Sequence, residues 1–218
     1  MKIKKFPQSC LLITSKSGAT ILVDPGKINY EEKFLKDWSK ANAILVTHKH
    51  GDHFYPAAVK TIKAPLYSTQ EVQNTYPDFK FKVIKEGDKF KVKDFKITVV
   101  KAIHGFLPKM KKGGQVFENV GYIVEADGVT LYITSDTICF NNDYKADYLF
   151  APATGYGITM SAYETALYTK EVGAKKLIIC HQDNIADYPV DLSFIETNMK
   201  ANKIKYTIPK IGQSIELK

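Results

Sequence analysis

The stretch THKHGDHF, residues 47–54, concentrates side chains that bind metal ions. It holds three of the chain's five histidines, His48, His50 and His53, together with Asp52. Imidazole nitrogen is the commonest protein ligand of metals, and carboxylate oxygen suits the same cations. The segment follows the apolar run AILVT, and in extended backbone residues i and i+2 share a face. His48 and His50 are therefore expected to reach one ion. Asp52 and His53, at the start of the next helix, are expected to address a second ion close by.

Four side chains in one loop cannot complete two metal sites, so further ligands must come from elsewhere in the chain. Three residues each follow an apolar, strand-like run: His104 after KITVVKAI, Asp136 after TLYIT, and His181 after KKLIIC. The rim at the carboxyl ends of strands is where α/β proteins commonly place functional loops. These residues are predicted to complete the sites, and with them every histidine of the chain is used.

With THKHGDH, a strand-end histidine, the SDT segment and a last strand-end histidine, the sequence resembles the metallo-β-lactamase fold superfamily over nearly its whole length. The resemblance implies a four-layer αββα sandwich and two divalent metal ions. Zinc is the first expectation, manganese is an alternative, and iron ranks after both. By position the resemblance implies three sets of ligands: His48, His50 and His104 for the first ion; Asp52, His53 and His181 for the second; and Asp136 as the bridge.

Two ions that share a water lower its pKa toward neutrality, which provides a nucleophile without a serine or a cysteine. We therefore expect a dinuclear hydrolase that uses a metal-bridging hydroxide on a small anionic ester, lactone or phosphoester. Asp52 is expected to take a catalytic part, by orienting the nucleophile or accepting its proton. The hydroxyl groups of Thr47, Ser135 and Thr137 are expected to support the ligands.

A narrower resemblance concerns LFAPATGYGITMSAYETA, residues 149–166. It is similar to a small branch of metal-dependent hydrolases related to ascorbate-6-phosphate lactonase. The branch carries a Gly-rich turn, a Thr-Met pair and a Glu-containing helix, matched here by Gly155, Gly157, Thr159, Met160 and Glu164. Glu164 also has a simpler explanation, because with Ser161 it forms the capping box of a helix. The sequence departs from the branch in FPQSC, where the branch often has a histidine and this chain has Gln8 or Ser9.

The longest irregular stretch, residues 105–121, follows His104 directly. Long loops in compact domains are often functional. Lys109, Lys111 and Lys112 in this loop are candidates for binding a phosphate or carboxylate of a small-molecule substrate, against the alternative of a solvated loop. Tyr156, in the Gly-rich turn, is a further candidate contact.

Three other functions compete with this hypothesis. A metal-dependent nuclease or phosphodiesterase fits the basic charge, but the chain lacks room for the inserted domain of RNA-degrading members. It also lacks the His-containing motif of transfer-RNA 3′-end processing members. A redox enzyme of the flavodiiron branch usually carries a glutamate in place of His50. A metal-free binding protein is disfavoured because all seven ligands are present.

Composition limits the partners. The net charge is +8, and all 31 basic residues are lysine. Arginine, whose planar fork suits the reading of phosphates and bases, is absent, so nucleic acid is allowed as a partner without being favoured. The three cysteines form no CxxC, which indicates reduced thiols in a cytoplasmic protein. No secretory signal and no apolar run of membrane-span length are evident, so no membrane partner is expected. The oligomeric state stays open.

Short apolar runs separated by turn formers predict a single α/β domain over residues 1–218, with two packed sheets and helices outside. Strands are predicted at 10–14, 20–24, 43–47, 66–68, 147–151, 175–180, 203–208 and 213–217. Further antiparallel strands are predicted within 81–104, and a hairpin at 122–134 turns at Asp127-Gly128. Helices are predicted at 31–40, 55–63, 161–172 and 191–201.

Overall fold

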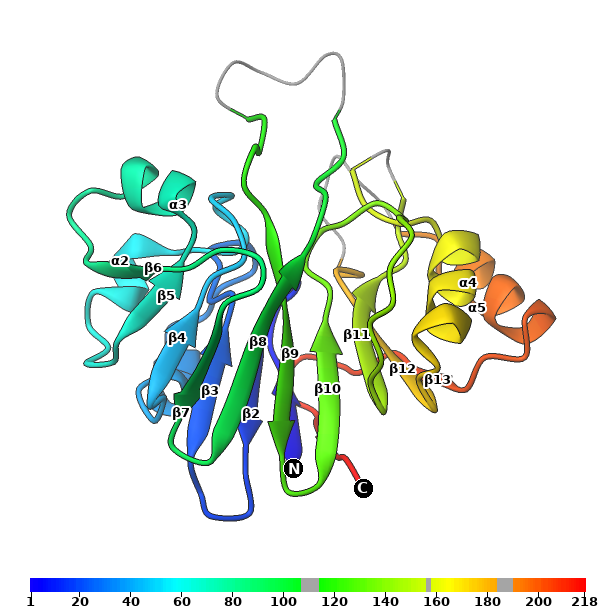
Figure 1. The fold of residues 1–218 in the computed structure, drawn as a ribbon, viewed down its shortest axis with the longest axis horizontal. Coiled ribbons are helices and arrows are strands. Elements are labelled where there is room, and N and C mark those ends of the chain that lie inside the picture. The colour runs from blue at the N-terminus through cyan, green and yellow to red at the C-terminus, as the bar shows by residue number, and fades with distance from the viewer. Residues whose placement is uncertain (107–113, 156–157, 184–189) are drawn as a thin grey trace.

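Two seven-stranded sheets pack face to face, and helices cover both outer faces (Figure 1). The computed structural model describes residues 1–106, 114–155, 158–183 and 190–218. The expected αββα architecture is confirmed. None of the helices in these ranges combines the length and the apolar character needed to cross a membrane.

The first sheet is antiparallel at one edge and parallel at the other. Its parallel part begins where β3 pairs with β4. In spatial order its strands are β14 (Ser214–Glu216), β1 (Lys2–Lys5), β2 (Leu11–Thr14), β3 (Thr20–Val23), β4 (Ala43–Leu45), β5 (Leu66–Ser68) and β6 (Phe81–Val83).

The second sheet repeats this plan with an antiparallel and a parallel half. In spatial order its strands are β13 (Tyr206–Thr207), β12 (Lys176–Cys180), β11 (Tyr148–Pro152), β10 (Val129–Ile133), β9 (Val120–Ala126), β8 (Phe95–Lys101) and β7 (Lys89–Val92). The predicted hairpin is confirmed, because β9 and β10 are joined by Asp127 and Gly128 with φ of 57° and 75°. Both angles are those that a two-residue turn of this type requires.

Side chains alternate between two hydrophobic layers along the buried strands. In β3, Ile21 and Val23 pack between the sheets, while Leu22 faces the outer helices. In β10, Leu131 packs between the sheets and Tyr132 faces outward. Because successive side chains point to opposite faces of a strand, these strands supply apolar side chains to both faces of each sheet.

Helices close the two outer layers. Over the first sheet lie a 3₁₀ turn at Glu32–Phe34 and three short helices, α1 (Leu35–Trp38), α2 (Pro56–Val59) and α3 (Gln70–Thr75). Over the second sheet lie α4 (Ala162–Val172) and α5 (Leu192–Ala201). In Figure 1, α2 and α3 lie on the left flank and α4 and α5 on the right flank. Ser161 and Glu164 form both hydrogen bonds of the expected capping box at the start of α4.

Several expected boundaries are wrong. The helix predicted at 55–63 is one turn, α2, which begins at Pro56 and is followed by turns before Pro65. The helix predicted at 31–40 is divided into the 3₁₀ turn and α1. The strands predicted to reach residues 47 and 104 end at Leu45 and Lys101. Sequence patterns also missed the helix α3 and the strand β1. The strand β1 is a lysine-rich segment that is held by its pairing with β14 and β2.

Candidate metal centre

The seven predicted ligands meet at one end of the sandwich, beyond the carboxyl ends of the strands that precede them. They follow β4, β8, β10 and β12 and divide into two groups. Within each group the candidate ligand atoms all lie within 4.8 Å of one another. The structure places every ligand in a loop two or more residues beyond its strand, except His181, which follows β12 directly.

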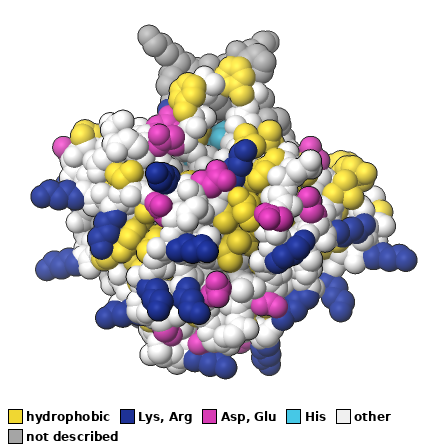
Figure 2. Space-filling model, viewed as in Figure 1, with side chains coloured by type: hydrophobic (Ala, Val, Ile, Leu, Met, Phe, Trp, Pro, Cys, Tyr) yellow, Lys and Arg dark blue, Asp and Glu magenta, His cyan; other side chains and the backbone are white. Residues whose placement is uncertain are grey.

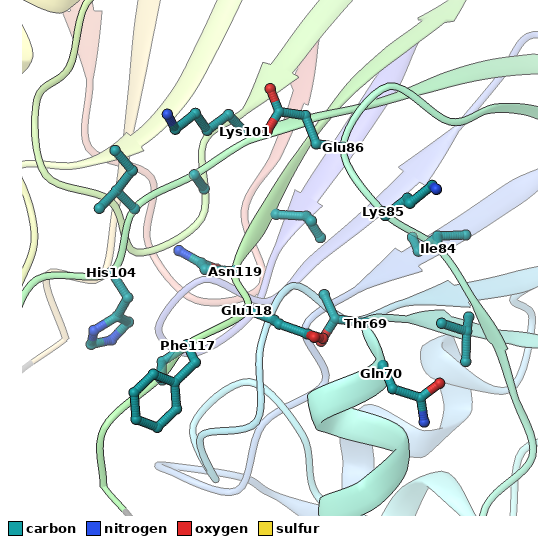
Figure 3. A pocket seen from close by; sticks show the side chains of 15 residues that line it. Thr69, Gln70, Ile84, Lys85, Glu86, Lys101, His104, Phe117, Glu118 and Asn119 are labelled. Carbon is teal, nitrogen blue, oxygen red and sulfur yellow. The ribbon is translucent and has the colours of Figure 1, made fainter.

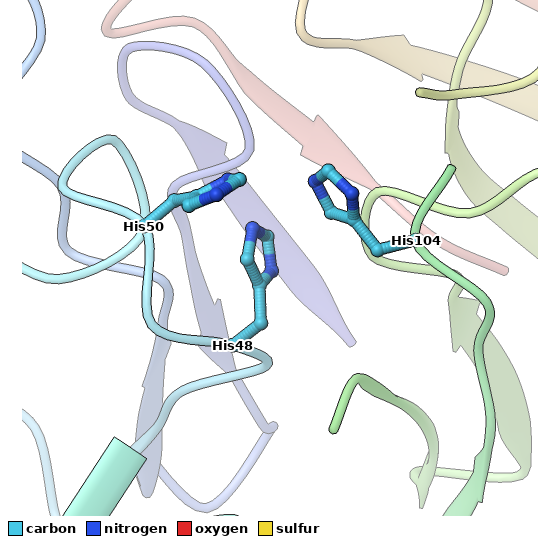
Figure 4. A group of neighbouring side chains, drawn as sticks. All are labelled: His48, His50 and His104. Carbon is cyan, nitrogen blue, oxygen red and sulfur yellow. The ribbon is translucent and has the colours of Figure 1, made fainter. Parts of the chain in front are cut away.

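The first group consists of His48, His50 and His104. The ring centroids form a nearly equilateral triangle with sides of 4.8, 5.0 and 4.8 Å. Figure 4 shows the three rings facing a common point, with His104 reaching it from the opposite side. The expectation that His48 and His50 share the face of an extended strand is wrong, because they lie in a bend after β4. The bend brings the rings together instead.

The second group consists of Asp52, His53, Asp136 and His181. His181 Nε2 lies 3.1 Å from Asp52 Oδ2 and 3.1 Å from Asp136 Oδ2. His53 Nε2 lies 3.5 and 3.4 Å from the same two oxygens. Asp52 and His53 were expected at the start of a helix, but they lie in a turn that ends before Pro56.

Backbone carbonyls set the tautomers of two histidines. His104 Nδ1 donates to Gly105 O at 2.8 Å, which leaves Nε2 without a proton. His50 Nε2 donates to Gly114 O at 2.6 Å, which leaves Nδ1 as the free nitrogen. A ligand histidine normally donates its second nitrogen in this way, because the hydrogen bond fixes the ring and its tautomer.

Asp24 orients the other two buried histidines, although the sequence analysis did not select it. His53 Nδ1 donates to Asp24 Oδ2 at 2.8 Å, and Thr47 Oγ1 donates to the same oxygen at 2.8 Å. Because the Thr47 proton is used there, its oxygen accepts from His48 Nδ1 at 3.1 Å. Both rings thus turn Nε2 toward the metal centre. The available signal was an acidic residue ending the apolar run TILVD, the same signal that selected His104 and Asp136.

Electrostatics differ between the two groups. Burial lowers the pKa of His48, which therefore stays neutral. Burial would also lower the pKa of His181, but Asp136 and Asp52 raise it to about 10. Burial raises the pKa of Asp52, yet the nearby His53 and the hydrogen bond from His181 bring it down to about 2. The metal-free second group therefore holds protons between carboxylates, and a divalent cation would supply the same positive charge.

Comparison with known proteins agrees with this site. A model of the beta-lactamase superfamily domain matches residues 2–181. The chain belongs to this superfamily. A "UPF0173 metal-dependent hydrolase" from Christiangramia forsetii is 28% identical over the full length of both chains. Another, from Sulfurisphaera tokodaii, is 28% identical over 89% of this chain and 86% of its own. The expectation of a metal-dependent hydrolase of this superfamily is confirmed, while the relation to ascorbate-6-phosphate lactonase stays a prediction.

Solved structures share the fold. Igni18, a metallo hydrolase from Ignicoccus hospitalis, has a TM-score of 0.78 at 22% identity, covering 100% of this chain and 99% of its own. An isothiocyanate hydrolase from Delia radicum gut bacteria has a TM-score of 0.81 at 18% identity, with the same coverage. CmlA, a diiron β-hydroxylase from Streptomyces venezuelae, has a TM-score of 0.75 at 10% identity, covering 99% of this chain and 54% of its own. The superfamily fold therefore occurs with more than one metal chemistry.

The side chains of this superfamily member fit divalent metal ions. Four buried atoms of the two groups have no hydrogen-bond partner among the described residues: Nε2 of His48, His53 and His104, and Oδ1 of Asp136. An unpartnered buried polar atom costs about 1–3 kcal/mol, so its presence calls for a ligand. Imidazole nitrogens with carboxylate oxygens suit zinc, and they are compatible with manganese and iron.

Gly26 permits the close approach of two loops of the centre. A Cβ at this position would lie 1.7 Å from the backbone oxygen of Asp52. The approach is fixed on either side, since Lys27 N donates to Gly51 O at 2.7 Å and Tyr55 N donates to Pro25 O at 2.8 Å. The backbone that carries Asp52 is thus packed directly against the loop after β3.

Gly26→Ala is therefore expected to destabilise the protein by about 1–3 kcal/mol, the usual cost of overpacking, and to weaken metal binding by displacing Asp52. The matched control is Gly51→Ala, because a Cβ there meets nothing within 4 Å. Its effect should stay within about 0.5 kcal/mol. Urea unfolding of the two metal-free variants measures the free energy of unfolding of each. Equal stability of the two variants would contradict the close approach.

A groove of about 540 Å³ lies beside the first group (Figure 3). His104 and Asn119 line the groove, together with apolar side chains such as Ile84 and Phe117. Lys101 also lines it. In Figure 2 a histidine side chain is visible in a hollow flanked by hydrophobic side chains, while lysines are spread over the face among acidic residues. On this face, the described lysines therefore form no continuous basic track.

The remaining site predictions have different outcomes. Thr47 and Ser135 contact His48, as expected for supporting hydroxyls, with Ser135 Oγ 3.4 Å from its Nδ1. Thr137 Oγ1 instead accepts from the backbone nitrogen of Ile103, the residue before His104. The four substrate candidates lie outside the described residues: Lys109, Lys111, Lys112 and Tyr156.

The segment FPQSC, residues 6–10, where the sequence departs from the lactonase-related branch, lies against the second ligand group. Gln8 is buried with a φ of 53°, and its carbonyl accepts from His181 N at 3.1 Å. Its own backbone nitrogen donates to Asp183 Oδ2 at 2.6 Å. Gln8 therefore holds the backbone of the last ligand.

Proposed function

We propose that this protein is a dinuclear metal-dependent hydrolase of a small anionic ester, lactone or phosphoester. The observation that carries the proposal is that two complete ligand groups lie side by side. The ring centroids of His48, in the first group, and His53, in the second, are 3.9 Å apart. Asp136 Oδ2 lies 3.4 Å from His53 Nε2 and 3.1 Å from His181 Nε2, while its Oδ1 is buried without a hydrogen-bond partner among the described residues.

Each group would hold one ion, zinc being the first expectation, and Asp136 would bridge the two. Bound divalent ions supply a water of lowered pKa and polarise the scissile carbonyl or phosphoryl group. The assignment of ligands is His48, His50 and His104 for one ion, and Asp52, His53 and His181 for the other.

Differences in exposure give the centre a floor and a mouth. His48 and His53 are fully buried and Asp136 is 2% exposed, so these side chains form the floor. Asp52 and His181 are partly exposed, at 15% and 13% of their side chains. Because the pKa of Asp52 is about 2, its carboxylate is ionised at neutral pH. At the mouth it can orient the nucleophile or accept its proton.

The groove beside His104 would take the part of the substrate away from the reacting bond. Ile84 and Phe117 offer apolar contact, and Lys101 offers a positive charge for a carboxylate or phosphate. Lys85, Glu86 and Glu118 also line the groove, so its charges are balanced. The groove therefore suits a compact molecule with an apolar body, and Lys101 can pair with its anionic group.

The first test is metal content per chain by elemental analysis, on protein purified without chelator and without a histidine tag. Close to two ions per chain supports the two-site assignment, and no uptake on dialysis against zinc or manganese would overturn it. The loaded protein is then assayed on a lactone, an anionic 4-nitrophenyl ester, 4-nitrophenyl phosphate and bis(4-nitrophenyl) phosphate. An isothiocyanate joins the panel because a protein of the same fold hydrolyses that class. Turnover of the diester alone would favour a phosphodiesterase instead.

A further inference from the structure

Glu71, in the first turn of α3, joins two segments that surround the metal centre. Its Oε1 accepts from Lys49 Nζ at 2.7 Å. Its Oε2 accepts from the backbone nitrogens of Phe117 and Glu118, both at 2.9 Å. Glu118 returns the contact, since its Oε2 accepts from Glu71 N at 2.7 Å. One carboxylate thus receives three hydrogen bonds from two distant parts of the chain.

The Lys49 side of this junction belongs to the metal-binding loop. Lys49 stands between His48 and His50, and its carbonyl accepts from Tyr76 OH, just after α3, at 2.9 Å. The ion pair with Glu71 is largely removed from solvent, with the two side chains 13% and 14% exposed. Such a pair is held more rigidly than an exposed one, and removing one partner leaves the other charge unpaired.

The other side of the junction contacts the ligands directly. Gly114 O accepts from His50 Nε2 at 2.6 Å. Asn119 Nδ2 donates to Asp136 O at 2.8 Å, and Asn119 Oδ1 accepts from Ser135 Oγ at 2.8 Å. Glu71 accepts from the backbone nitrogens of Phe117 and Glu118, which lie between Gly114 and Asn119 in the chain.

We propose that Glu71 is a positioning residue of the metal centre. By holding residues 114–119 against the Lys49 loop, it keeps the Gly114 carbonyl where it accepts the Nε2 proton of His50. The His50 tautomer with a free Nδ1 is thereby selected for the first ion. The same contacts fix Phe117 and Glu118 in the wall of the groove. The inference rests on the proposed metal-dependent function, but the tautomer of His50 can be read without any metal.

The test is Glu71→Gln, which keeps the length of the side chain but turns amide hydrogens toward donors. The matched control is Glu196→Gln on α5, which removes a surface Glu–Lys pair at 3.7 Å. Zinc affinity is measured by competition with a chromophoric chelator. The ring nitrogens of His50 are observed by ¹⁵N NMR in the metal-free chains, with the signals assigned by His50→Gln.

We expect Glu71→Gln to bind one of two zinc equivalents about 10–100-fold more weakly, the usual effect of losing support behind a ligand. His50 should change from the Nε2–H tautomer to a mixture, while Glu196→Gln matches the original protein in both measurements. Unchanged zinc affinity and unchanged tautomer would overturn the inference. Equal weakening at both sites, together with loss of folded structure in the metal-free variant, would also overturn it, because Glu71 would then act on folding alone. If the original protein binds no metal, the proposed function fails, and the tautomer comparison still decides the role of Glu71.

Discussion

Asp136→Asn is expected to lower kcat/KM by at least about 10³-fold, on the order of 4 kcal/mol of transition-state stabilisation. The substitution keeps the volume and removes the charge of a residue that is 2% exposed and contacts both His53 and His181. An amide cannot bridge two cations as a carboxylate does, so at least one ion should be lost. Elemental analysis measures the metal, and the substrate found in the panel gives kcat/KM.

Two comparisons make this result interpretable. Asp78→Asn changes the same residue type at an exposed position away from the centre and should leave metal and rate unchanged. Far-UV circular dichroism of Asp136→Asn should resemble that of the original protein, because Asn fills the same space. A variant with full metal content and full rate would show that Asp136 is not a ligand.

Removing metal is expected to lower the melting temperature by roughly 8–16 °C and to abolish activity. Metal bound at about a thousand times its dissociation constant stabilises the fold by about 4 kcal/mol, and a chain of this size shifts by about 2–4 °C per kcal/mol. The structural reason is the set of unpartnered Nε2 atoms of His48, His53 and His104, together with carboxylates held in the interior. Calorimetry before and after dialysis against a chelator measures the shift.

Adding zinc or manganese back should restore both stability and rate, and the metal that does so at the lower concentration identifies the better ligand match. The chelator should lower the melting temperature of Asp136→Asn by less than it lowers that of the original protein, because the variant holds fewer ions. Full activity in protein shown to hold less than about a tenth of an ion per chain would contradict a metal-dependent reaction.

Local sequence was sufficient to predict the elements that depend on neighbouring residues. Short apolar runs and, within 81–104, alternating apolar residues predicted the strands of both sheets except β1, and Asp127-Gly128 predicted the hairpin between β9 and β10. The helices α4 and α5 begin within a residue of their predicted starts, since Ser161 and Asp191 cap them through their own side chains. The seven candidate ligands were also selected from residue type and from their places after apolar runs, and the structure brings all seven together.

Tertiary structure decided what depends on residues far apart in the chain. β1 is a strand because Ile3 pairs with Ile215, more than 200 residues away. Asp24 and Glu71 gain their hydrogen bonds to the ligand loop only when the loop after β3 and the helix α3 pack against it. The free nitrogen of each histidine was likewise undetermined, because His50 donates to Gly114 O, 64 residues later. Sequence thus determined which side chains could bind metal, whereas folding determined which atom each presents, because hydrogen bonds to distant backbone and carboxylate groups fix the rings.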